Sequence, residues 1–113
     1  MAPVTWDTFE IAAYQWQEGE RRVLEAPPEQ QRTLERVVES AVAELRRRLG
    51  GPFRASELAA LYEEQGTRWV IEIASAVAPE EPWAWDQRVA DAAFARYLRE
   101  ASDYAGGRRV LGD

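Results

Sequence analysis

The chain of 113 residues is long enough for one ordinary domain, and it contains no histidine, cysteine, lysine or asparagine. These absences exclude a Ser–His–Asp triad, zinc sites built from cysteine or histidine, thiol chemistry and Schiff-base catalysis by lysine. The formal net charge of −6 argues against broad nucleic-acid binding, and a hydrophobic share of 46 % with five tryptophans argues against disorder.

The sequence also carries information about location. No apolar run approaches the roughly 20 residues needed to cross a bilayer. Residues 1–7 lack the basic region and the long apolar stretch of a secretory signal. Without cysteine there is no disulfide framework, so we expect a cytoplasmic protein. Arginine supplies all 14 positive charges beside abundant alanine, which is typical of a GC-rich bacterial genome.

The first predicted helix begins at a Thr5 cap and runs to about Gln17. Its main apolar face consists of Trp6, Phe9, Ala13 and Trp16. Ile11 and Tyr14 lie off that face, which favours burial on two sides. Gly19 is expected to interrupt the helix.

The second predicted helix begins near Pro28 and ends at the Gly-Gly-Pro sequence of residues 50–52. Its apolar stripe consists of Leu34, Val37, Val38, Ala41, Val42, Leu45 and Leu49. Glu35 and Glu39 share one face, a spacing that could suggest a metal site. The arginines interleaved with them favour a solvated ion-pair surface instead.

The third predicted helix begins at a Ser56 cap and ends at Gly66, and a fourth spans residues 68–78 before Pro79. The fourth helix is apolar nearly all round, so it is expected at the centre of the bundle. Residues 69–73 are rich in β-formers, and a strand is the alternative there.

The last predicted helix runs from near Pro82 to about Tyr104, with an alanine-rich stripe that permits close approach of a neighbouring helix. The predicted fold is a single all-α domain over residues 1–113, a compact four- or five-helix bundle around the fourth helix. Residues 1–4 and 106–113 are expected to be loose termini.

A carboxylate in the most apolar segment is the first candidate site. Glu72 lies between two isoleucines, where a charge is costly unless it is paired, and Arg68 precedes it by one helical turn. A structural ion pair, an edge position and a carboxylate in a binding cleft all remain open.

The second candidate site is the segment that contains Trp83, Trp85 and Asp86. Indoles two positions apart cannot point the same way in a helix or its entry turn, so one of them is expected to be at least partly exposed. Exposed tryptophan is typical of protein interfaces. We therefore predict a binding surface formed by Trp83, Trp85 and Asp86, with Glu72 and Arg68.

Two carboxylate pairs have the spacing of helical metal sites: Asp7 with Glu10, and Glu100 with Asp103. No lysine or asparagine accompanies them to support phosphates. We predict no metal and no cofactor, and a divalent-metal-dependent hydrolase of nucleotides is the third functional hypothesis.

The expected function is a small non-enzymatic protein-binding or regulatory module that presents a tryptophan-containing acidic surface. Its expected partner is another protein or a second copy in a homodimer, and no membrane is involved. The alternative is a transcription-associated protein that binds DNA or RNA polymerase through Arg46, Arg47 and Arg48. A helix-turn-helix over residues 56–78 belongs to that alternative, but its second helix offers few side chains to base edges.

Overall fold

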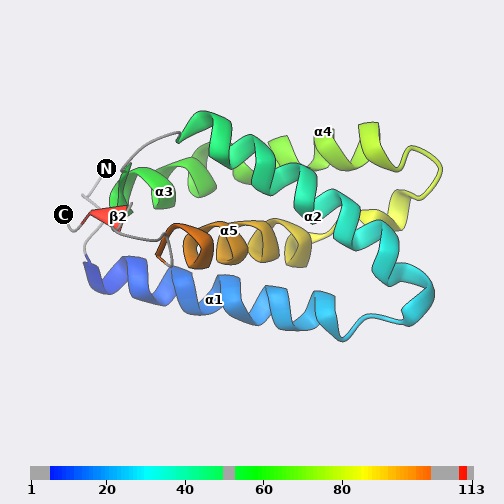
Figure 1. Cartoon of the computed structure of the whole chain (residues 1–113), viewed down its shortest axis with the longest axis horizontal. Helices are drawn as coiled ribbons and strands as arrows, with labels where there is room; N and C mark the ends of the chain where they lie inside the picture. Colours follow the sequence, from blue (N-terminus) through cyan, green and yellow to red (C-terminus); the bar gives the residue numbers. More distant parts are fainter. Residues whose placement is uncertain (1–5, 50–52, 103–109, 112–113) are drawn as a thin grey trace.

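A computed structural model describes residues 6–49, 53–102 and 110–111. In chain order the elements are α1 (Trp6–Leu24), α2 (Pro28–Arg48), β1 (Phe53–Arg54), α3 (Ala55–Leu61), the π-helical turn η1 (Tyr62–Gly66), α4 (Thr67–Val77), the 3-10 turn η2 (Pro82–Ala84), α5 (Gln87–Ser102) and β2 (Val110–Leu111). The predicted all-α bundle is confirmed, since the helices pack side by side around one core (Figure 1).

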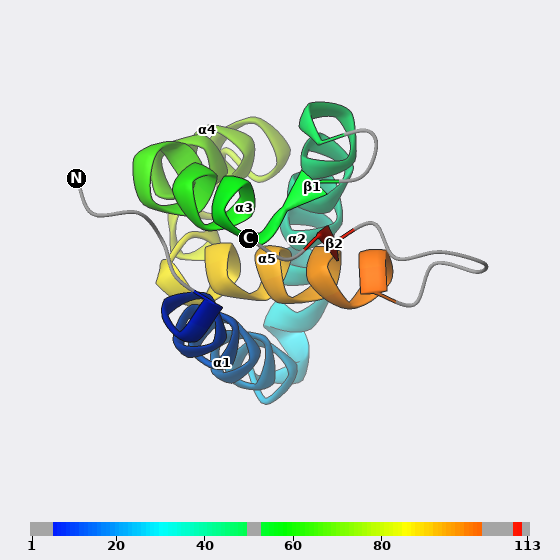
Figure 2. The same ribbon diagram turned by 90° about the vertical axis from the view of Figure 1, so that its left-hand side faces the viewer.

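The central helix is α5, which lies between α1 on one side and α2 and α4 on the other (Figures 1 and 2). Its buried residues occupy almost every face: Val89, Ala90, Asp91, Ala92, Ala93, Phe94, Ala95 and Tyr97. Four of these are alanines, and small side chains allow neighbouring helices to approach from several directions.

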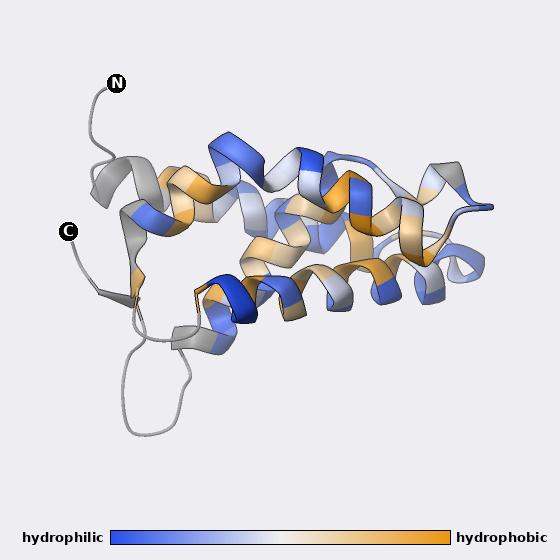
Figure 3. Ribbon diagram, turned by 90° about the horizontal axis from the view of Figure 1, so that it is seen from above, coloured by the Kyte–Doolittle hydropathy of each residue, from blue (hydrophilic) through white to orange (hydrophobic). Residues whose placement is uncertain are grey.

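The prediction that residues 68–78 form the centre was wrong, although the helix itself is confirmed as α4. One side of α4 packs on the core through Trp69, Val70 and Ala74, while Ile71 and Glu72 are exposed. Hydrophobic and hydrophilic residues alternate along the helical ribbons, which is the pattern of amphipathic helices with one apolar face (Figure 3). Likewise, Ile11 and Tyr14 of α1 are 71 % and 67 % exposed, so burial on two sides is not observed for them.

Gly19, which was predicted to interrupt a helix, and Gly66, which was predicted to end one, both lie inside continuous helical backbone. Gly66 has φ −54° and ψ −46°, and the chain passes through it from η1 into α4. A Cβ on Gly19 would lie 2.3 Å from Cβ of Asp91, and one on Gly66 would lie 3.2 Å from the Phe94 ring. Both glycines therefore serve close packing against α5, which explains why neither ends a helix.

The remaining boundaries differ in smaller ways. α5 begins at Gln87 instead of near Pro82, because Trp85 has extended backbone between η2 and the helix. Part of the tail predicted to be loose is paired, since β2 lies parallel to β1. The other predicted loose residues (1–4, 106–109 and 112–113) and the predicted helix end at Tyr104 lie outside the described part of the chain.

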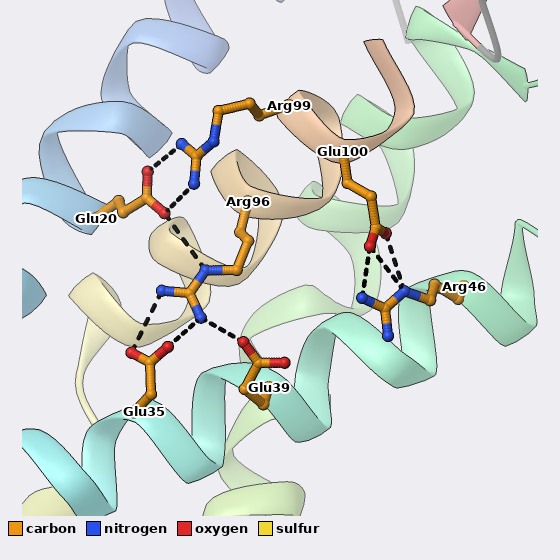
Figure 4. Close-up of polar contacts among 7 residues, drawn as sticks. All are labelled: Glu20, Glu35, Glu39, Arg46, Arg96, Arg99 and Glu100. Atoms are coloured by element: carbon orange, nitrogen blue, oxygen red, sulfur yellow. Dashed lines mark hydrogen bonds and ion pairs between the residues drawn. The ribbon is translucent and has the colours of Figure 1, made fainter. Parts of the chain in front are cut away.

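Ion pairs join α1 and α2 to the central helix (Figure 4). Arg99 donates to both carboxylate oxygens of Glu20, at 2.6 and 2.9 Å. Arg96 donates to Glu35 at 2.5 Å and to Glu39 at 2.7 Å. The predicted ion-pair surface of Glu35 and Glu39 is thus confirmed, but its cation comes from α5 instead of α2.

Glu20 is buried, and its hydrogen bonds to Arg99 hold the pKa of its carboxyl below the ordinary value of 4.5 despite the opposing effect of burial. Because this pKa is lowered on folding, the stability that the pair adds is present above pH 4.5. It is lost as the pH falls through the lowered pKa.

No helix in the described part of the chain is both long and apolar enough to span a membrane.

Candidate functional site

The segment between α4 and α5, residues 78–86, places its two indoles in different environments. We call this segment the elbow. Trp83 is 39 % exposed, Ala84 is fully buried, and Trp85 packs partly buried against the core. As predicted, one of the two indoles is exposed. The buried Ala84 between them anchors η2, which contacts α2 and α4, so Trp83 is presented from a fixed turn.

Asp86, the third predicted residue of the elbow, caps α5. Its Oδ1 accepts a hydrogen bond from the backbone N–H of Arg88 at 2.8 Å, and its Oδ2 accepts one from Arg88 Nε at 2.7 Å. A side-chain acceptor before the first helical turn satisfies a donor that the helix itself leaves open. The carboxylate of Asp86 is therefore already engaged in holding the start of the helix.

Arg68 and Glu72 lie exposed on α4. Among the residues that the structure describes, no ion pair joins them, so Glu72 has the edge position that was one of the three interpretations. Neither residue lines any of the three hollows between α2 and the elbow. Trp83, Trp85 and Asp86 are neighbours in sequence, but only Trp85 lines a hollow at the elbow, whereas Asp86 lines another hollow between α1 and α5. Arg68 and Glu72 lie apart from the elbow on α4.

Three hollows lie one after another from α2 to the elbow. The first has a volume of about 510 Å³ and is lined by Arg32, Glu35, Arg36, Glu39, Ser40 and Val77. The second, of about 210 Å³, is lined by Arg36, Val77, Ala78, Pro79, Glu80 and Glu81. The third, of about 300 Å³, is lined by Ala74, Ser75, Ala78, Pro79, Glu81 and Trp85.

Neighbouring hollows adjoin, since they share lining residues, and we call the row of three the elbow groove. Arg36 and Val77 line both the first and the second hollow. Ala78, Pro79 and Glu81 line both the second and the third. The groove therefore runs from the outer face of α2, across the end of α4, to the indole of Trp85.

Charges of both signs line the elbow groove. At the α2 end Arg32 and Arg36 lie beside Glu35 and Glu39, whose carboxylates are paired with Arg96 of α5. Arg36 also donates a hydrogen bond to the carbonyl of Val77 at 3.4 Å. Glu80 and Glu81 lie at the elbow end. Oε2 of Glu81 is buried and has no hydrogen-bond partner within the described structure. A buried acceptor without a partner is costly, so this oxygen is suited to a donor supplied by a bound molecule.

The arginine cluster at the end of α2 is already paired. Arg46 binds Glu100 through three hydrogen bonds, and Glu44 binds both Arg47 and Arg48. The guanidinium of Arg48 also lies 4.9 Å from the ring centroid of Trp69. These cations stabilise the end of the helix and its contacts, and each of the three is already engaged by a carboxylate.

The carboxylate pairs of the metal hypothesis can be followed only in part. Glu100 is bound to Arg46, whereas the side chains of Asp7 and Glu10 and all of Asp103 lie outside the described residues. Over the part of the chain that the structure describes, no group of three or more aspartates and glutamates has a metal-binding arrangement.

A further hollow, of about 420 Å³, lies between α1 and the start of α5. We call it the Asp91 cavity. Its lining consists of Gln15, Glu18, Gly19, Arg22, Asp86, Gln87, Arg88 and Asp91. Asp91 is only 6 % exposed, and its Oδ1 accepts a hydrogen bond of 2.5 Å from the hydroxyl of Tyr62. That hydroxyl oxygen in turn accepts hydrogen bonds from Gln87 and Gln15, at 2.7 and 3.3 Å.

Burial dominates the titration of this cluster. It raises the pKa of the Asp91 carboxyl above the ordinary value of 3.8, against the effect of the hydrogen bond from Tyr62. Burial and the neighbouring Asp91 raise the pKa of Tyr62 above 10.0, so the phenol remains a donor at neutral pH. Because ionised Asp91 is disfavoured in the fold, its contribution to stability falls as the pH rises from 3.8 through the raised pKa.

Sequence reasoning missed Asp91, although the signal was present. The residue is a lone carboxylate between Ala90 and Ala92 in an apolar run, as Glu72 is between two isoleucines. The same argument applied to the helix that is in fact central would have selected Asp91. Tyr62, Gln15 and Gln87 could not be found this way, because they meet only through tertiary packing.

No protein-family model, no curated protein and no solved structure matches this chain.

Proposed function

We propose that this protein is a protein-binding module that takes an extended segment of a partner protein along the elbow groove. The observation that carries the proposal is a row of adjoining hollows that ends at the segment with an exposed indole. The first two hollows share Arg36 and Val77, and the second and third share Ala78, Pro79 and Glu81. Trp83 lines none of the three hollows, but it is 39 % exposed in the elbow. Tryptophan is among the residue types enriched in interface hot spots.

The shape and charge of the groove favour a peptide segment over a compact ligand. An elongated, open depression with apolar walls suits successive side chains of an extended chain. Oε2 of Glu81 offers a buried acceptor, which an arginine or lysine of the partner can satisfy. Arg32 and Arg36 at the other end suit an acidic side chain. The partner segment therefore carries a basic residue for Glu81 and apolar residues for Trp83 and Trp85.

No observation favours the other two hypotheses in the same way. Arg46, Arg47 and Arg48 are held by carboxylates, and a nucleic acid would have to displace those carboxylates. Glu100 of the proposed metal site is held by Arg46.

Selection of a displayed library of random 12-residue peptides against the whole protein tests the proposal. We expect the enriched peptides to contain arginine or lysine next to apolar residues. Trp83→Ala and Glu81→Gln should each weaken their binding about tenfold or more, because Trp83 is the exposed indole of the elbow and Glu81 lines two of the hollows. Tyr14→Ala is the matched control: Tyr14 is 67 % exposed on α1, away from the groove, and its removal should leave binding unchanged.

Thermal melting of each variant shows whether the fold is retained, which we expect because Trp83 is only partly buried. Sedimentation of the free protein separates peptide capture from self-association. If no peptide is enriched, or if the enriched peptides bind both groove variants as tightly as the unchanged protein, the elbow groove is not a peptide-binding site.

A further inference from the structure

Two groups of opposite sign in the Asp91 cavity, Asp91 and Arg22, make no ion-pair contact, although the charge of Arg22 acts on the carboxyls of Asp91 and Glu18 and favours their ionised forms. The paired charges of its lining are Glu18 with Arg21 and Asp86 with Arg88. Asp91 and Arg22 form no ion pair with any residue that the structure describes. A buried negative group and an exposed positive group therefore face the same hollow.

Asp91 is held in place by neutral donors. Tyr62 donates to its Oδ1, and Gln87 lies within 3.4 Å of the same oxygen. These contacts orient the carboxylate without neutralising it. An ionised carboxylate that is 6 % exposed remains costly until a cation pairs with it.

The backbone around this cluster is specialised. Tyr62 opens the π-helical turn η1, and such turns inside helices are found frequently at functional sites. On the opposite wall Gly19 brings the backbone of α1 against Asp91, where a side chain would collide.

We propose that the Asp91 cavity binds a small zwitterion, a free α-amino acid, whose ammonium group contacts Asp91 and whose carboxylate contacts Arg22. The volume of about 420 Å³ lies within the range of small-molecule sites. An amine without a carboxylate leaves Arg22 unpaired. A carboxylic acid without an amine leaves Asp91 unpaired. The ligand class thus follows from the sign and the place of the two unpaired groups.

This site is separate from the elbow groove, since the two share no lining residue. The proposal does not rest on peptide binding. Trp83→Ala should leave amino-acid binding unchanged, and Asp91→Asn should leave peptide binding unchanged, so either proposal can fail without the other.

Titration calorimetry of the whole protein with each of the 20 common L-amino acids tests the inference. We expect a subset of them to bind. We then compare the amino acid that binds most tightly with two analogues, the amine that lacks its carboxylate and the acid that lacks its amino group. Each analogue should bind at least tenfold more weakly than the amino acid. If none of the 20 binds, or if either single-charge analogue binds as well as the amino acid, the inference is wrong.

Two variants identify the contacts, and Arg68→Ala on α4 serves as the control for loss of an exposed arginine. Asp91→Asn should abolish binding of the amino acid while the protein remains folded. Arg22→Ala, at an exposed position, should weaken binding of the amino acid about tenfold and leave binding of the amine analogue unchanged. If Arg22→Ala leaves the ratio of the affinities for the amino acid and for the amine unchanged, Arg22 does not contact the carboxylate. This result contradicts the inference even if Asp91→Asn fails to fold.

Discussion

Replacement of Phe94 by alanine is expected to lower the free energy of unfolding by about 3–5 kcal/mol. Phe94 is fully buried in α5, and its ring lies 5.4 Å from Trp16, 5.2 Å from Tyr62 and 6.2 Å from Trp69 between ring centroids. It therefore joins α1, η1 and α4 to the central helix. A typical domain has only about 5–15 kcal/mol of stability in total, so this loss brings the protein close to unfolding.

Urea denaturation followed by circular dichroism measures this effect. Ile71→Ala on α4 is the matched control, because Ile71 is a large apolar residue that is 37 % exposed. It should cost less than about 1 kcal/mol, since little of its surface is removed from water. Equal losses for the two variants would mean that α4 contributes as much to the core as α5.

Gly19→Ala is expected to lower the free energy of unfolding by about 2 kcal/mol, although alanine is the better helix former. The added Cβ would lie 2.3 Å from Cβ of Asp91. Both atoms are fixed to helical backbone and cannot rotate away, so α1 and α5 must separate. Overpacking of this kind costs about 3 kcal/mol, and the helix propensity of alanine returns only about 1 kcal/mol.

Gly66→Ala is the matched comparison in the same urea experiment. Its Cβ would meet the Phe94 ring at 3.2 Å, a milder conflict that a shift of a few tenths of an ångström relieves. The propensity gain of about 1 kcal/mol then offsets most of the cost, and the net change should be small. A Gly19→Ala variant as stable as the unchanged protein would show that α1 and α5 are not in such close contact.

The periodic segments were predictable because their signals are local. In α2 an apolar stripe repeats every three to four residues between a starting proline and terminal glycines. Six of its seven predicted residues are buried. The glycines of the other helices carried no comparable information. A glycine that ends a helix and a glycine that lets a second helix approach cannot be told apart in the sequence. Only the position of Asp91 or Phe94 in the folded protein distinguishes the two roles.

The central helix was misassigned for a related reason. Hydropathy ranks α4 above α5, because α4 has two charged residues among its isoleucines and valines, whereas α5 has five charged residues. Centrality depends instead on how many neighbours a helix can accommodate, and the alanines of α5 allow contact on several faces. That error directed attention to Glu72, which is exposed, and away from Asp91, which is buried.

The elbow was predictable in part. The spacing of Trp83 and Trp85 predicted that one indole is exposed, and the prolines predicted a break between helices. The groove was not predictable, since Arg36 on α2 and Glu81 in the elbow are brought together only by the packing of α2 against α4 and η2.

Native-state hydrogen exchange, resolved amide by amide, distinguishes the two possible centres of the bundle. Amides buried in the central helix should exchange only through global unfolding, whereas those of a peripheral helix also exchange through smaller openings. We expect the slowest amides in α5, from Val89 to Tyr97, and faster exchange in α4. Slowest exchange in α4, with α5 exchanging through local openings, would contradict this arrangement.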